Sequence, residues 1–72
     1  MFVRIIRPTI ERVIECEGYE IQNHQTPEPG TPDYITLELR PDRGAFSITK
    51  EPGNEIYIMN EAGKTIDRYR WA

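Results

Sequence analysis

Hydrophobic and polar positions alternate along the C-terminal half of the chain in four runs that turn residues separate. The runs are Tyr34–Arg40, Ala45–Lys50, Glu55–Asn60 and Thr65–Trp71. They are rich in β-branched and aromatic residues, as strands are. The segments between them each contain a glycine, and two contain a proline, which are the residues that tight turns need. The pattern predicts a four-stranded antiparallel meander.

The turns also predict which side chains share a face. A loop over residues 41–44 would place Leu39 opposite Phe46 and Leu37 opposite Ile48, and the later turns would place Ile66 opposite Ile58. All four strands then contribute to one apolar face: Ile35, Leu37, Leu39, Phe46, Ile48, Ile56, Ile58 and Ile66. Because a slip of one residue would scatter this set, its agreement between strands supports the register.

The opposite face of the predicted meander is unusually aromatic. It carries Tyr34, Thr36, Ser47, Thr49, Tyr57, Met59, Tyr69 and Trp71. Such residues suit an interface better than a solvated face. Two alternatives remain open: the Met1–Arg7 strand or a loop could cover this face and make a second small core, or a bulge near Asp67 could turn Tyr69 and Trp71 back to the main core.

The N-terminal half has weaker signals. Phe2–Ile6 predicts a first strand and Tyr19–His24 a further one, since both alternate. Between them, Thr9–Glu17 is expected to form a short helix, capped by Thr9 and stopped at Gly18, with a strand through Arg12–Glu17 as the rival interpretation. Residues 25–33 hold three prolines and are expected to form an exposed loop.

The predicted fold class is therefore α+β. One short N-terminal helix, with Ile10, Val13 and Ile14 on one stripe, would cover the apolar face of a four- to five-stranded, mainly antiparallel meander sheet. The alternative is an all-β small barrel in which residues 9–17 form another strand. Seventy-two residues are expected to form a single domain over 1–72.

Composition narrows the chemistry. One cysteine and one histidine cannot form a disulfide within the chain or a structural zinc site, and no cofactor or metal is expected. Cys16 among glutamates is a poor nucleophile partner for His24, so the protein is expected not to be an enzyme. No apolar run is long enough for a membrane span, and a cytoplasmic location is the expectation.

The functional hypothesis is a non-catalytic protein-interaction module, accessory, regulatory or inhibitory to its partner. Its expected partner-binding residues are Tyr34, Tyr57, Met59, Tyr69 and Trp71. The partner would be another protein or a second copy, because an open sheet edge or an aromatic face on so small a domain favours pairing.

The alternative function is nucleic-acid binding by Arg68, Arg70 and Trp71, where basic and aromatic residues alternate on the last strand. The net charge of −3 disfavours this alternative, because a nucleic acid attracts a basic surface.

Overall fold

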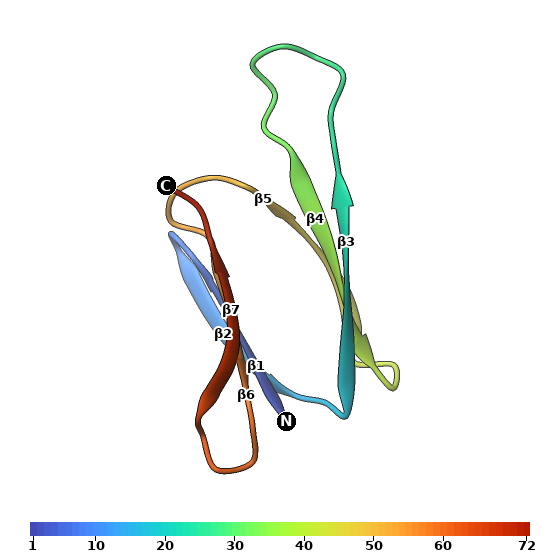
Figure 1. Cartoon of the computed structure of the whole chain (residues 1–72), viewed down its shortest axis with the longest axis vertical. Coiled ribbons are helices and arrows are strands. Elements are labelled where there is room, and N and C mark those ends of the chain that lie inside the picture. The colour runs from blue at the N-terminus through green and yellow to red at the C-terminus, as the bar shows by residue number, and fades with distance from the viewer.

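The computed structural model describes every residue, Met1–Ala72, and contains seven strands and no helix (Figure 1). The strands are β1 (Phe2–Arg7), β2 (Ile10–Glu15), β3 (Gly18–His24), β4 (Tyr34–Arg40), β5 (Gly44–Thr49), β6 (Glu55–Met59) and β7 (Thr65–Arg70). All pairings are antiparallel. They form two sheets, one of four strands in the order β2-β1-β6-β7 and one of three in the order β3-β4-β5.

The predicted α+β class is wrong, because residues 9–17 form no helix. Pro8 and Thr9 make a turn from which β2 folds back along β1, with Ile10 opposite Arg7. A helix of barely three turns is marginal by itself, whereas pairing with β1 satisfies the backbone of β2 along its length. The predicted apolar stripe does not form: Ile14 packs against the core, while Ile10 and Val13 are 56% and 57% exposed.

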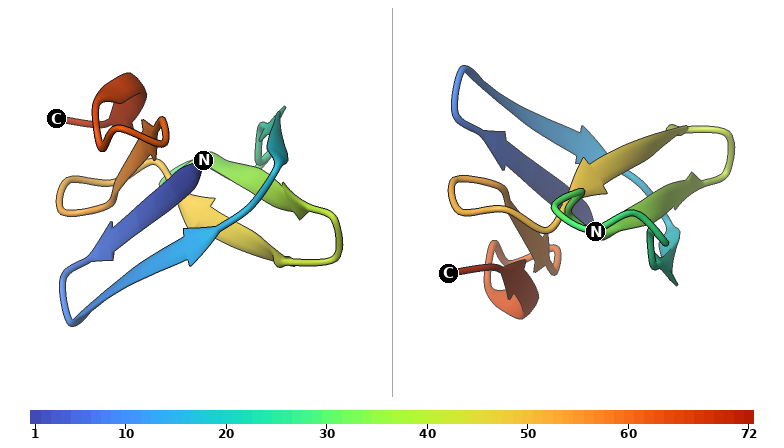
Figure 2. Two further views of the ribbon diagram at one scale, coloured as in Figure 1. Left: turned by 90° about the horizontal axis from the view of Figure 1, so that it is seen from below. Right: turned by 90° about the horizontal axis from the view of Figure 1, so that it is seen from above.

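The alternative of an all-β barrel assigned a strand to this segment correctly, but no closed barrel is formed. The single meander is also wrong, since β5 and β6 belong to different sheets. A lone four-stranded sheet would need the missing helix to cover its apolar face. In this fold the two sheets instead face each other (Figure 2), and the core cluster lies between them.

The segment that carries the chain from β5 to β6 is tied down by one buried amide. The Asn54 side chain is 9% exposed and donates to the carbonyl oxygen of Thr49 at 2.9 Å and to its hydroxyl at 3.0 Å. Gly53 before it has φ +97°, and a Cβ there would lie 3.2 Å from Pro8 Cγ. Glycine therefore lets this turn adopt its shape against the β1–β2 turn.

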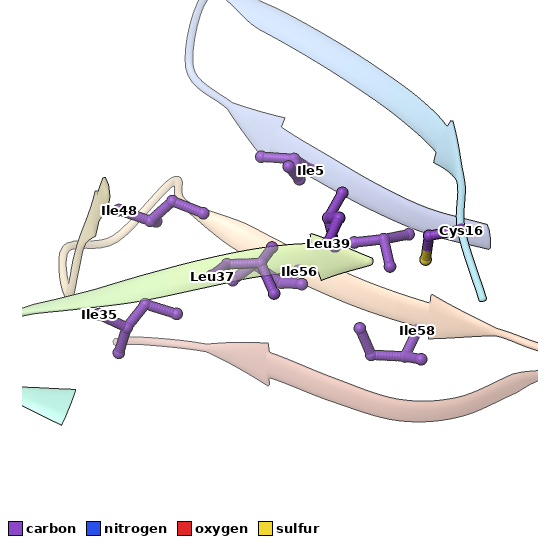
Figure 3. Packing of buried hydrophobic residues seen from close by; sticks show 9 residues of the cluster. Ile5, Cys16, Ile35, Leu37, Leu39, Ile48, Ile56 and Ile58 are labelled. Carbon is purple, nitrogen blue, oxygen red and sulfur yellow. The ribbon is translucent and has the colours of Figure 1, made fainter. Parts of the chain in front are cut away.

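The core lies between the sheets (Figure 3). Six residues of the predicted apolar face are buried as expected: Ile35, Leu37, Leu39, Ile48, Ile56 and Ile58. Phe46 is half-buried and packs against them. The N-terminal segment completes the cluster with Val3, Ile5 and Cys16, each at most 4% exposed. The β1 strand is therefore central to the fold, paired with β2 on one side and β6 on the other.

A register shift between Ile58 and Met59 decides the orientation of β7. Ile58 lies opposite Asp67 instead of Ile66, and Ile56 lies opposite Tyr69. Ile66, predicted to be in the core, is 53% exposed. The bulge places Tyr69 on the inner side, as the bulge alternative anticipated, because one extra residue reverses which side chains face inward.

At the two lateral openings of the sandwich the sheets have no backbone pairing, and side-chain contacts bridge them. Between β7 and β3, Asp67 Oδ2 accepts hydrogen bonds from the hydroxyls of Tyr69 (2.8 Å) and Tyr19 (3.4 Å). Between β2 and β5, the Arg12 guanidinium lies 5.4 Å from the centre of the Phe46 ring, and Arg7 donates to the Ser47 carbonyl at 3.2 Å. These contacts hold the sheets together while leaving four strand edges unpaired.

Candidate interaction surface

The aromatic residues predicted to share one face lie in three places. Tyr34 is on the outer face of the three-stranded sheet, and Tyr57 and Met59 are on the outer face of the four-stranded sheet. Tyr69 and Trp71 pack against the core. The separation of β5 from β6 divides the face, and the bulge in β7 divides it again. The role of each residue in partner binding stays a prediction.

Tyr34 sits in a mainly polar environment. Its ring stacks on His24, with centroids 4.7 Å apart and an interplanar angle of 12°. The His24 Nε2 atom is 2.8 Å from the Thr36 hydroxyl. The same outer face carries Gln22, Ser47 and Thr49. This composition is typical of a solvated sheet face.

Tyr69 and Trp71 contact the hydrophobic core. Burial, together with the hydrogen bond to Asp67, raises the pKa of the Tyr69 phenol well above its usual value. Trp71 is half-buried and packs against the same cluster. Both residues therefore contribute to the interior, and only part of each remains for contact with another molecule.

The outer face of the four-stranded sheet gathers the remaining apolar groups. Because Val3, Ile5, Ile56 and Ile58 point inward, their strand neighbours point outward. The pairing of the strands arranges these neighbours in three rows, which we call the outer sheet face. The rows are Glu15–Phe2–Met59, Val13–Arg4–Tyr57–Arg68 and Glu11–Ile6–Glu55–Arg70. No helix or third sheet lies over this face (Figures 1 and 2).

Phe2, Ile6 and Val13 belong to this surface, and the predictions from sequence did not include them. Phe2 and Ile6 alternate with the buried Val3 and Ile5, so β1 is apolar on both sides. That double pattern was the available signal. The pattern could not show that these residues lie beside Tyr57 and Met59, because β1 and β6 pair although they are far apart in the sequence.

Charges on the outer sheet face are sorted by edge. Glu11 and Glu15 lie on the β2 edge, and Arg68 and Arg70 lie on the β7 edge. Arg68 and Arg70 have no carboxylate within ion-pair distance. One edge is therefore acidic, and the opposite edge is basic and unpaired.

The middle of the face is tied by hydrogen bonds. Arg4 forms an ion pair with Glu11, and this contact raises the pKa of Arg4. The Tyr57 hydroxyl donates to Glu55 at 2.8 Å, which raises the pKa of Tyr57. These bonds orient two of the side chains most suited to contact with a partner.

Other parts of the molecule offer little chemistry. Cys16 is buried just before β3 and His24 ends that strand, so the length of β3, roughly 20 Å, lies between them. A cavity of about 620 Å³ is lined mainly by charged side chains, including Glu15, Glu61 and Arg43. No three His, Cys, Asp or Glu side chains come together where they could hold a metal ion. No helix in the structure is long and apolar enough to cross a membrane.

Comparison with protein-family models, with curated proteins and with solved structures finds no match to this chain.

Proposed function

We propose that this protein is a non-catalytic protein-interaction module that binds a protein partner through the outer sheet face. One observation carries the proposal: the two inner faces pack on each other, and the outer face of the four-stranded sheet keeps an apolar cluster over which no other element lies. That cluster is formed by Phe2, Ile6, Val13, Tyr57 and Met59. Val13 is 57% exposed, the other four are half-buried, and Arg4 and Glu55 lie among them.

The residue types support a protein as the partner. Tyrosine, phenylalanine, methionine and arginine are enriched in protein interfaces, whereas lysine and glutamate are depleted in their centres. Tyr57 and Phe2 give rigid contact area at a low cost in side-chain entropy. Glu11 and Glu15 lie at one edge of the face and Arg68 and Arg70 at the other, and Arg4 and Glu55 lie between.

Nucleic-acid binding receives less support. Arg68 and Arg70 lie on the outer sheet face, but Trp71 packs against the core, so the three do not form one platform. The same face carries Glu11, Glu15 and Glu55, whose charges oppose a phosphate backbone. We therefore propose a protein partner.

A photocrosslinking experiment tests the proposal. The photoreactive residue benzoylphenylalanine replaces Tyr57 on the outer sheet face or, as a matched control, Gln22 on the polar face of the three-stranded sheet. Cells expressing each full chain are irradiated, and crosslinked species are separated by mass. We expect a discrete species from position 57 and none from position 22. Equal crosslinking from the two positions, or none from position 57, would contradict the proposal.

A further inference from the structure

We infer that the partner is a second copy of this chain, and that two outer sheet faces pack against each other about a two-fold axis parallel to their strands. The inference rests on the proposed function and specifies the partner. Its basis is the order of residues in the three rows, which is complementary to itself when the face is turned over.

The geometry follows from the strand order β2-β1-β6-β7. A two-fold axis that runs along the strands between β1 and β6 places β1 of one copy over β6 of the other, and β2 over β7. Each row then meets the same row of the second copy. Sheets that pack face to face keep their strand directions within about 30°, so this axis suits the usual packing of two sheets.

The central strands match in the first two rows under this operation, whereas in the third row Ile6 lies over Glu55 of the second copy. In the first row, Phe2 meets Met59 of the second copy, which pairs an aromatic ring with a flexible thioether. In the second row, Arg4 meets Tyr57 of the second copy, a favourable contact between a guanidinium and an aromatic face. Both contacts occur twice because the axis is two-fold.

The charged edges match as well. In the third row, acidic Glu11 lies over Arg70 of the second copy, and Glu15 lies diagonal to Arg68 of the second copy. Both arginines lack a carboxylate partner within their own chain. An axis perpendicular to the strands would instead put β2 over β2 and acid over acid, which like-charge repulsion disfavours. The charges therefore select one orientation.

Charge reversal provides a sharp test, because Glu11 and Arg70 are both exposed in the isolated chain. We expect sedimentation velocity of the wild-type chain to show a monomer that becomes a dimer as concentration rises. Glu11→Arg and Arg70→Glu should each weaken the dimer by about tenfold or more, because each creates two like-charge contacts. An equal mixture of the two variants should restore it as a heterodimer, since both contacts become attractive again.

Controls separate this result from general effects of charge or folding. Lys64→Glu changes an exposed cation in the β6–β7 turn, outside the outer sheet face, and should leave association unchanged. Circular dichroism checks that each variant keeps its β structure. A wild-type chain that stays monomeric at all concentrations, or variants that mixing does not restore, would overturn the inference.

The crosslinking experiment distinguishes failure of this inference from failure of the proposed function. A species of twice the chain mass from position 57 supports the second copy. A species containing a different protein, with a monomeric wild-type chain in sedimentation, overturns the second copy and leaves the interaction module standing. Absence of any crosslinked species together with a monomeric chain overturns both.

Discussion

Asp67 accepts hydrogen bonds from two tyrosine hydroxyls that belong to different sheets, Tyr69 at 2.8 Å and Tyr19 at 3.4 Å. This contact closes the side of the sandwich where β7 and β3 have no backbone pairing. It also explains the raised pKa of Tyr69, whose phenol is partly removed from water and donates to a carboxylate. A charged phenolate at that position would face Asp67 without a proton to share.

The alkaline limb of stability should depend on Tyr69. An unfolded tyrosine loses its proton near pH 10, whereas folded Tyr69 keeps its proton to higher pH. Above pH 10 the unfolded state therefore binds fewer protons, and the free energy of unfolding falls as pH rises. Tyr69→Phe should cost about 1 kcal/mol at pH 7 through the lost hydrogen bond, and this difference should shrink above pH 10. Denaturant titrations at several pH values measure it; a constant difference would contradict the assignment.

At the scale of elements, the register shift in the β6–β7 hairpin has the largest consequence. Regular pairing would place Ile66 opposite Ile58 and bury both. The shift between Ile58 and Met59 leaves Ile58 fully buried and Ile66 53% exposed. It brings Asp67 and Tyr69 to the inner side, where they reach Tyr19 of the facing sheet. The bulge thus gives up a contact between Ile58 and Ile66 and allows the hydrogen bonds of Asp67 with Tyr19 and Tyr69.

Two matched substitutions test this register. Ile58→Ala should lower the free energy of unfolding by about 2–5 kcal/mol, because it leaves a cavity in the core. Ile66→Ala should lower it by less than about 1 kcal/mol, the range of strand propensity at an exposed position. Denaturation followed by Trp71 fluorescence compares them. Equal costs would mean that β7 pairs in the regular register.

For the molecule as a whole, the sandwich has three strands with neighbours on both sides and four strands at edges. The inner strands are β1, β6 and β4, and the edges are β2, β7, β3 and β5. Inner strands carry most of the fully buried side chains, including Val3, Leu37 and Ile56. The facing of two outer sheet faces would leave all four edges unpaired. If two copies paired through a strand edge instead, the backbone amides of at least one edge strand would become hydrogen-bonded.

Hydrogen exchange should reveal this division. We expect the hydrogen-bonded amides of β1, β4 and β6 to exchange at least about tenfold more slowly than those of the edge strands, which open locally. The same order should hold at concentrations where the chain pairs with itself. Nuclear magnetic resonance or mass spectrometry gives the rates by segment. An edge strand that becomes the slowest on concentration would indicate pairing through that edge.

The β4–β5 pairing illustrates how far the sequence could lead. Leu37 was expected opposite Ile48 and lies opposite Phe46, an offset of two residues. The expected inward faces survive that offset, because side chains alternate with a period of two. The helix over residues 9–17 failed for a different reason: Ile10, Val13 and Ile14 fit both a helical stripe and a strand, and only pairing with β1 resolves the ambiguity.

The candidate surface shows the same limit. Tyr57 and Met59 could be placed on an outward face from the alternation of β6 alone. Their neighbours could not, since Phe2, Arg4 and Ile6 reach them only through a pairing between the two ends of the chain. The alternation of the last strand predicts an outward face for Tyr69 and Trp71. The bulge reverses that alternation, and no distinct residue pattern marks a bulge in the sequence.

The sequence by itself determined the strand-forming segments from Tyr34 onward, the turns between them and six of the nine buried apolar residues. These are local properties, because alternation and turn chemistry act over a few residues. The tertiary structure alone decided the second sheet, the central position of β1, the bulge and therefore the outer sheet face. Those features depend on which distant segments bury each other's apolar side chains best. Local patterns do not distinguish between the alternative strand pairings.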